Sequence, residues 1–167
     1  YQSPSAFAGN PWMVDLDDLV ACGWLPPLED PDFDDHHCEF ERVIPYRLAA
    51  LKTAWNGFLE KSSEADRTAL AEFTRRHAAW LDDYALFMVL KDRYGAPWTQ
   101  WPVALACRDP QALRLLEVEK AHALGFWRFV QWRFDVQWQR LRHDAHARGI
   151  HIVGDVPADR SSLDHPK

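Results

Sequence analysis

The sequence predicts an α/β protein, of which this chain supplies a mostly α-helical part. Across residues 46–147, apolar side chains recur at spacings of three and four, which is typical of one face of an α-helix. Gly149 then stops the last helix, and the short apolar run 150–153 predicts a buried strand that ends at Gly154 and Asp155. A helix that feeds a short apolar strand is the repeating unit of α/β proteins.

Residues 1–45 hold six of the eleven prolines. Because proline fixes φ and removes a backbone donor, this part is expected to be extended and looped. Within it, "DLDDLVACGWL" predicts a short helix that ends near Gly23, and "EDPDFDD" predicts an acidic turn behind it. Such a region needs a larger scaffold to hold it in place.

Two helices are expected between Pro45 and Gly95. The first follows Pro45 in "YRLAALKTAWNGFLEK", and its apolar face consists of Leu48, Leu51, Trp55 and Leu59. Ser62 or Ser63 can cap the second, with Asp66 three residues after Ser63 in the manner of a capping box. The second helix is long enough that we expect one break, between Trp80 and Asp83.

A third helical stretch is expected from Asp109, as N-cap, and Pro110 to Gly149. If continuous, its roughly 39 residues would span on the order of 58 Å. Its apolar positions occupy more than one face, so neighbours are expected on several sides. These positions are Phe126, Trp127, Phe129, Val130, Trp132, Phe134, Trp138 and Leu141.

Composition excludes several classes of protein. The 167 residues, 47% hydrophobic and 26% charged, are enough for one domain with a core. A net charge of -6, with Lys and Arg spread singly, argues against a nucleic-acid partner. No apolar run approaches the roughly 20 residues of a membrane helix, so we expect no membrane partner. The three widely spaced cysteines, Cys22, Cys38 and Cys107, indicate neither a disulfide framework nor a zinc knuckle and favour a cytoplasmic location.

Four residues are candidates for a binding site. Asp155 would lie at the end of an apolar strand, where a carboxylate faces a cleft, although a loop cap or an ion-pair partner would explain it equally well. Tyr1, in the loop "YQSPSAFAGNP", could stack on or hydrogen-bond a sugar, or belong to an ordinary irregular loop. Trp98 and Trp101, in "APWTQWP", could form a sugar platform or anchor the loop by packing.

Metal and cofactor sites are not expected. His36, His37 and Cys38 are adjacent and cannot all face one ion without a second cluster. His143 and His146 share a helix face but lack the metalloprotease glutamate between them. The acidic string Asp30, Asp32, Asp34 and Asp35 lacks the glycine and distal glutamate of a calcium loop. No GxGxxG, P-loop or GxSxG motif occurs.

Five ordered motifs nevertheless resemble one family: "YQSPSAFAGNPWMVDLDDL", "WLDDYALFMVLKDRYG", "PWTQWP", "GFWRFVQWRFDVQWQRLR" and "ARGIHIVGDVP". Together they resemble the 4-α-glucanotransferases of glycoside hydrolase family 77, over residues 1 to about 157. The resemblance implies a (β/α)8 TIM barrel with helical insertions. Residues 1–45 would be an active-site loop region after the first barrel strand, 46–108 a helical insertion, 109–157 a long helix and a barrel strand, and 158–167 a polar tail unlike the family.

The same resemblance implies a function. Tyr1 corresponds to the family tyrosine that contacts bound α-1,4-glucan near the cleavage point, and Asp155 to an acidic residue shared across the wider clan. The implied mechanism is retaining, with a covalent glucosyl intermediate. The nucleophile and the acid/base would lie C-terminal to Pro157, so this chain, an N-terminal portion of the enzyme, is expected to be inactive alone.

Two other readings of the aromatic residues remain open. The chain could be a non-catalytic helical module that binds glucan through its aromatic loops, or a scaffold whose aromatics are all core. We also expect the isolated chain to aggregate or remain molten, because an unpaired "IHIV" strand and barrel-facing helices would lack their partners.

Overall fold

The computed structural model describes residues 5–29, 31–34, 36, 37, 39–95 and 97–153. All regular elements within these residues are helical. They are the 3₁₀ turn η1 (Pro11–Met13), α1 (Leu16–Ala21), α2 (Phe40–Lys61), α3 (Glu64–Tyr94), the 3₁₀ turn η2 (Trp98–Gln100), α4 (Val103–Ala106), α5 (Pro110–Glu119) and α6 (Ala121–Ala147).

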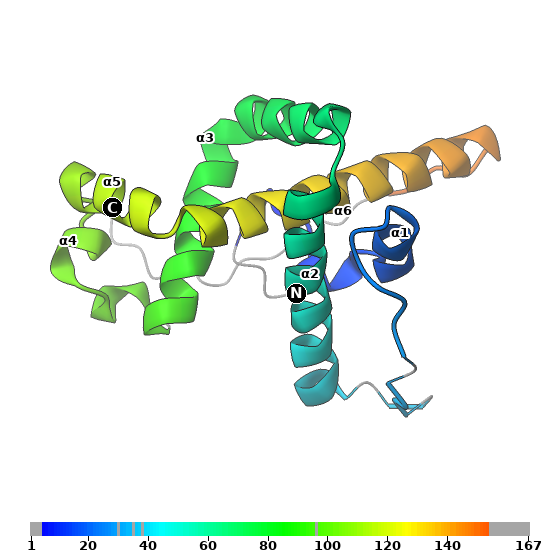
Figure 1. The fold of residues 1–167 in the computed structure, drawn as a ribbon, viewed down its shortest axis with the longest axis horizontal. Coiled ribbons are helices and arrows are strands. Elements are labelled where there is room, and N and C mark those ends of the chain that lie inside the picture. Colours follow the sequence, from blue (N-terminus) through cyan, green and yellow to red (C-terminus); the bar gives the residue numbers. More distant parts are fainter. Residues whose placement is uncertain (1–4, 30, 35, 38, 96, 154–167) are drawn as a thin grey trace.

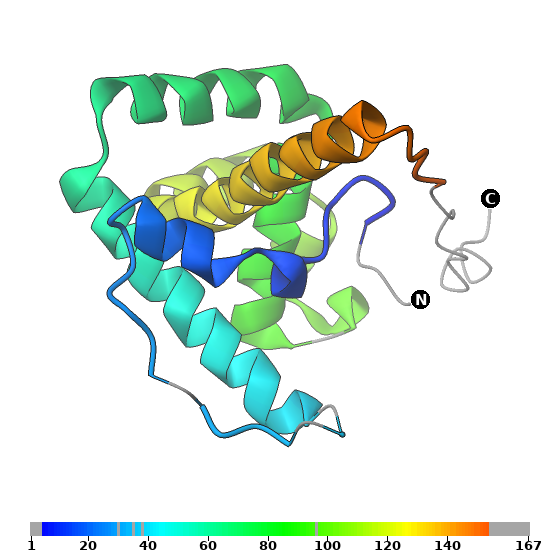
Figure 2. The same ribbon diagram turned by 90° about the vertical axis from the view of Figure 1, so that its right-hand side faces the viewer.

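Helix α6 organises the fold. It crosses the whole molecule and contacts α3, α2, α5 and η1 (Figure 1). The N-terminal segment, coloured blue, runs beside α6 (Figure 2). Neighbours on several sides were expected for this helix, and its aromatic residues Phe126, Trp127, Phe129 and Trp132 are indeed buried.

Aromatic rings fill the space where α2, α6 and the turn after α1 meet. Trp24 lies edge-on to Phe58 at 4.9 Å between ring centroids and 6.0 Å from Phe129. Trp55 stacks on Phe58 at 5.7 Å. Five of the nine tryptophans are buried, so core packing accounts for most of this unusual content. The buried ones are Trp24, Trp55, Trp101, Trp127 and Trp132.

Several local predictions are confirmed. Helix α1 ends at Ala21, and Gly23 follows with φ of +74°, a conformation that suits glycine. Ser63 and Asp66 form the expected capping box at the start of α3, which ends at Tyr94 before Gly95. The carboxylate of Asp109 accepts hydrogen bonds from the first backbone N–H groups of α5.

Three helix boundaries differ from the predictions. Helix α2 begins at Phe40, and Pro45 lies inside it, because a proline near the start of a helix removes only one backbone hydrogen bond. Helix α3 is continuous; its axis bends in Figure 1, but the expected break does not occur. The third helical stretch is not one helix: it divides at Lys120, whose φ of -112° and ψ of 20° interrupt the helical path.

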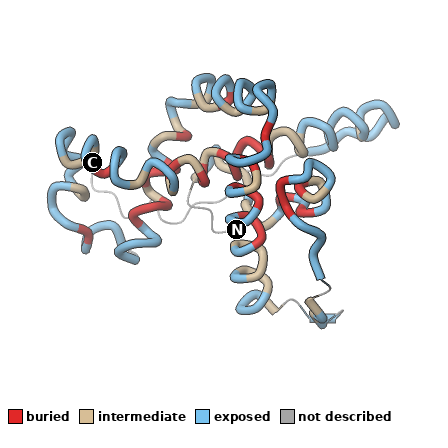
Figure 3. Tube along the Cα trace, in the orientation of Figure 1, coloured by how far each residue is buried: buried red, intermediate tan, exposed pale blue. Residues whose placement is uncertain are grey.

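The strand predicted for residues 150–153 does not form in the described part of the chain. These residues have no regular structure, and the side chains of Ile150 and Val153 are exposed. A strand is stable only beside a second strand, and the described residues contain none. The C-terminal end of α6 also projects from the other helices and is exposed (Figure 3).

In the parts of the chain that the structure describes, no helix combines the length and apolar character needed to cross a membrane.

Candidate functional site

The structure describes two of the four candidate site residues. Tyr1 and Asp155 lie outside the described residues. Trp98 and Trp101 lie in and directly after η2, and both line a cavity of about 280 Å³ between this loop and α3. The structure therefore brings these two candidate residues to one cavity.

The two tryptophans occupy different parts of this cavity. Trp98 is 45% exposed, so part of its indole is open to solvent. Trp101 is buried, and its indole N–H donates a hydrogen bond to the carbonyl oxygen of Gly95 at 2.6 Å. At the rim, Arg108 pairs with Asp83 of α3 at 2.6 Å. The cavity thus combines an exposed aromatic ring and a charged pair with a wall that is otherwise apolar, formed by Leu86, Phe87, Leu90, Leu105 and Ala106.

A second polar site lies where the N-terminal segment meets α6. Gln131, only 2% exposed, accepts a hydrogen bond from the N–H of Gly9 at 2.8 Å and donates one to the carbonyl of Gly9 at 3.0 Å. Its amide nitrogen also donates to the hydroxyl of Tyr84 in α3 at 3.3 Å. Burial raises the pKa of Tyr84 to about 12, so this hydroxyl stays protonated at neutral pH.

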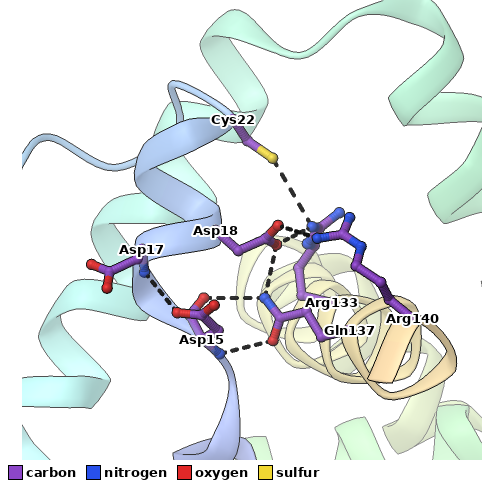
Figure 4. A network of polar contacts seen from close by, with 7 residues as sticks. All are labelled: Asp15, Asp17, Asp18, Cys22, Arg133, Gln137 and Arg140. Atoms are coloured by element: carbon purple, nitrogen blue, oxygen red, sulfur yellow. Dashed lines mark hydrogen bonds and ion pairs between the residues drawn. The ribbon is translucent and has the colours of Figure 1, made fainter. Parts of the chain in front are cut away.

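Gln137 makes the same pair of contacts with Asp15. Its side-chain oxygen accepts from the Asp15 N–H at 2.8 Å, and its nitrogen donates to the Asp15 carbonyl at 3.1 Å and to the Asp18 carboxylate at 2.8 Å (Figure 4). Asp15 itself caps α1. The entry of the chain into α1 is therefore fixed to α6 through one amide side chain.

Asp18 of α1 forms ion pairs with two arginines of α6. Its carboxylate pairs with Arg133 and, at 3.0 Å, with Arg140 (Figure 4). Burial alone raises the pKa of Asp18, but the hydrogen bonds from the three α6 side chains outweigh it and hold the pKa below its ordinary value. The guanidinium of Arg133 also lies against the rings of Trp24 and Trp132, 5.1 and 4.9 Å from their centroids.

An open groove of about 620 Å³ borders the Gly9 contact. Its walls come from the N-terminal segment, α3 and α6, and they include Phe7, Trp80, Phe134 and Trp138. The backbone of Gly9 is pressed against Phe134, because a Cβ atom at this position would lie 2.0 Å from the Cδ1 atom of that ring. Only glycine fits this contact without movement of the ring.

The two glutamines were not predicted from the sequence. Each glutamine lies beside the apolar stripe of α6, and this position alone only weakly indicates that a polar side chain is buried. Their backbone partners lie 122 residues away in the sequence, so no local pattern reveals the contact. The histidines weighed as metal ligands, His36, His37, His143 and His146, are all exposed. Within the described residues, no three His, Cys, Asp or Glu side chains gather where they could hold a metal ion.

Comparison with known proteins identifies the family. The sequence profile of the family described as 4-alpha-glucanotransferase matches residues 1–164. The chain belongs to the 4-alpha-glucanotransferase family. This membership confirms the resemblance drawn from the five ordered motifs.

Other members of the 4-alpha-glucanotransferase family are similar over nearly the whole chain. The 4-alpha-glucanotransferase of Thermus thermophilus is 45% identical over 158 residues, which cover 94% of this chain and 31% of that protein. The enzyme of Synechocystis is 35% identical over 161 residues, which cover 94% of this chain and 32% of that protein. The chain therefore spans about a third of the length of these relatives.

The fold is also that of a solved family member. The amylomaltase from Streptococcus agalactiae, whose structure contains acarbose, superposes with a TM-score of 0.86 at 27% identity. The match covers 95% of this chain and 32% of that protein. The helical arrangement described here thus also occurs in an amylomaltase.

Proposed function

We propose that this chain is part of a 4-α-glucanotransferase that moves segments of α-1,4-glucan from one chain to another glucan or to glucose. The observation that carries this proposal is the family match over residues 1–164. The substrate in this proposal is a maltooligosaccharide or a longer α-glucan. The proposed compartment is the cytoplasm, because the three widely spaced cysteines do not indicate a disulfide framework.

The unpartnered surfaces of the chain support a place within a TIM barrel. The C-terminal half of α6 leaves Leu141 exposed and Phe134 and Trp138 only half-buried, and the following Ile150, Ile152 and Val153 are exposed as well. A barrel helix buries one apolar face against the strands, and the apolar run after it forms the next strand. In this proposal, residues 1–45 follow the first strand, 46–108 are inserted, and 109–157 supply a helix and a strand.

The proposed chemistry divides the work between this chain and the rest of the enzyme. Retaining transfer needs two carboxyl groups about 5–5.5 Å apart on either side of the scissile bond. One forms the glucosyl intermediate, and the other protonates the leaving oxygen and later deprotonates the acceptor hydroxyl. We assign both to segments beyond this chain, with Tyr1 and Asp155 contributing substrate contacts. The chain alone would then be inactive.

A hybrid enzyme tests this proposal. In it, this chain replaces the matching segment of the Thermus thermophilus relative, so that every other segment is supplied by an established family member. We expect the hybrid to disproportionate maltotriose into glucose and longer products. The unmodified relative is the positive control, and the chain by itself should form no products. A hybrid that unfolds cooperatively but makes no product would contradict the proposal.

The cavity at Trp98 supports a second contact with glucan. The exposed indole of Trp98 offers a face for stacking on a pyranose ring, while Trp101 forms the inner wall. Because an aromatic contact contributes about 0.5–1.5 kcal/mol, Trp98→Ala in the hybrid should weaken maltooligosaccharide binding up to about tenfold. Val103→Ala, an exposed change on the neighbouring α4, serves as control. Equal affinity of the two variants, measured by calorimetry, would remove Trp98 from the binding surface.

A further inference from the structure

The cavity beside Trp98 has two charged side chains in an otherwise apolar and aromatic lining. They are Asp83 of α3 and Arg108, which lies just after α4. The two side chains pair at 2.6 Å and are 60% and 58% exposed, so a ligand in the cavity can reach both. Small-molecule sites are typically built in this way, with mostly apolar walls and a few polar groups that fix the orientation of the ligand.

The two tryptophans of the cavity differ in how the fold uses them. The indole N–H of Trp101 donates to the carbonyl oxygen of Gly95, and its ring lies 5.5 Å from that of Phe87 in α3. Trp101 is buried by these contacts, whereas Trp98 remains 45% exposed. Trp98 is therefore the ring of this cavity that a ligand can cover.

Arg108 adopts a backbone conformation that is unfavourable for arginine. Its φ is +57°, in the left-handed region where residues other than glycine are strained. This conformation ends α4, since the N–H of Arg108 donates to the carbonyl of Leu105 at 3.1 Å and the N–H of Asp109 to that of Ala104 at 2.7 Å. Glycine would end the helix in the same way without the strain. The backbone therefore gives no reason for an arginine here, and the reason lies in its side chain.

The stability of the fold does not explain this side chain either. An ion pair between two exposed side chains contributes little to the free energy of unfolding, because water surrounds both charges and two flexible side chains have to be ordered. The pair of Asp83 and Arg108 is of this kind. Strained backbone is found preferentially where a protein holds a ligand, and here the strained residue lines a cavity.

We propose that Asp83 and Arg108 orient the glucan at this cavity, by hydrogen bonds to the hydroxyl groups of a pyranose ring that stacks on Trp98. Within the described structure, their pair uses one guanidinium nitrogen and one carboxylate oxygen. Further N–H donors and the second oxygen remain for a ligand, and a sugar hydroxyl can both donate and accept. This inference rests on the proposed function, from which it takes glucan as the ligand, and it adds the two residues that select the orientation of the sugar.

The test follows Trp98 directly in the hybrid enzyme. The hybrid is labelled with 5-fluorotryptophan, and the fluorine signal of Trp98 is assigned by its loss in Trp98→Phe. Maltoheptaose is the probe, and turnover does not consume this class of ligand, because transfer between glucans conserves the number of α-1,4 bonds. We expect the signal of Trp98 to shift on titration and to reach saturation.

Substitutions at the two charged residues should weaken this binding. Arg108→Gly and Asp83→Asn should each raise the dissociation constant measured at Trp98 by about tenfold, the loss expected for a hydrogen bond to a charged group. Arg108→Lys keeps the charge but not the planar fork, so its constant should fall between those of the parent and Arg108→Gly. Arg93→Ala is the matched control, because it removes another exposed ion pair, with Glu119, outside the lining of the cavity. It should leave the constant unchanged.

Unfolding in urea separates a role in binding from a role in stability. Arg108→Gly relieves the backbone strain, so its unfolding midpoint should equal or exceed that of the parent hybrid. A lower midpoint together with weaker binding would overturn the inference, because the pair would then hold the loop in place and not the ligand. If Arg108→Gly does not fold, Asp83→Asn and Arg108→Lys carry the test.

The remaining outcomes distinguish the inference from the proposed function. A Trp98 signal that does not respond to maltoheptaose would overturn the inference, as would charged-residue variants that bind as tightly as the parent. In an active hybrid, either result leaves the proposed function standing. A folded hybrid that makes no product would overturn the proposed function, whether or not the Trp98 signal responds.

Discussion

Asp18 is the residue on which the attachment of α1 to α6 depends most. Its carboxylate is half-buried and accepts from Arg133, Gln137 and Arg140, which lie on successive turns of α6. Arg133 is only 5% exposed, and the Asp18 carboxylate neutralises its charge. Removing one partner of a buried pair leaves the other charge uncompensated, which costs more than the pair contributes.

The substitution Asp18→Asn should therefore lower the free energy of unfolding by about 2–3 kcal/mol at pH 7. Because the folded pKa of Asp18 lies below its unfolded value, its contribution is present above the unfolded pKa and is lost as pH falls through the folded pKa. Urea unfolding of the dilute chain at pH 7 and at low pH measures both effects, and the difference between parent and variant should shrink in acid. Asp17→Asn, an exposed neighbour in α1, is the control. A difference that is the same at both pH values would contradict this role.

At the scale of single residues, sequence patterns predicted caps better than buried polar contacts. Ser63, Asp66 and Asp109 were identified because capping depends on neighbours within three residues. Gln131 and Gln137 were missed because their partners are backbone groups distant in sequence, and no local pattern reports such a distance. Tyr1 and Asp155 remain predictions from family motifs.

At the scale of elements, two glycines set how closely neighbouring segments approach. A Cβ atom on Gly57 of α2 would lie 2.0 Å from the carbonyl oxygen of Trp24, a backbone atom in the turn after α1. A Cβ atom on Gly125 of α6 would lie 2.8 Å from the ring of Trp55. The first contact is shorter and is made with a backbone atom, whereas the second is longer and is made with a side chain, so the two positions should differ in how well they accept alanine.

Gly57→Ala should consequently destabilise the chain by about 2–3 kcal/mol, since overpacking outweighs the gain of up to about 1 kcal/mol in helix propensity. Gly125→Ala should cost less, because the added Cβ atom would lie 2.8 Å from a ring atom of Trp55 and not 2.0 Å from a backbone oxygen, while the same propensity is gained. Urea unfolding of both variants compares them directly. A smaller loss for Gly57→Ala than for Gly125→Ala would show that the turn at Trp24 yields more readily than the ring.

The positions of the helices followed from apolar spacing, but their ends did not. Apolar spacing did not predict that Pro45 lies inside α2. The apolar face that includes Leu51 and Trp55 is found only C-terminal to Pro45, whereas the helix begins at Phe40. Nor did apolar spacing predict the break at Lys120, because the spacing continues from α5 into α6. Tertiary context can override the local propensity from which such ends are predicted.

At the scale of the whole molecule, the two halves of α6 have different surroundings. The N-terminal half is enclosed by α2, α3 and the aromatic core, where Phe129 and Val130 are fully buried. The C-terminal half carries Leu141 exposed and Phe134 and Trp138 half-buried, and the exposed residues 150–153 follow it in the sequence. The strand predicted for residues 150–153 did not form because a strand needs a neighbouring strand from another part of the sequence. The apolar pattern of one segment gives no information about such a neighbour.

This asymmetry predicts how the isolated chain behaves. We expect the aromatic core to keep the helices folded, in place of the molten state that the sequence alone suggested, and the partly exposed apolar face of α6 to drive self-association, since such patches promote contact between copies. Replacing Trp138 and Leu141 with glutamine should reduce association at micromolar concentration and leave helix content unchanged, as measured by sedimentation velocity and circular dichroism. Leu115→Gln with Val118→Gln, an exposed pair on α5, is the matched control and should leave association unchanged. If the α5 pair suppresses association instead, the adhesive surface lies away from the face assigned here to the barrel, and the placement of α6 against the strands loses its support.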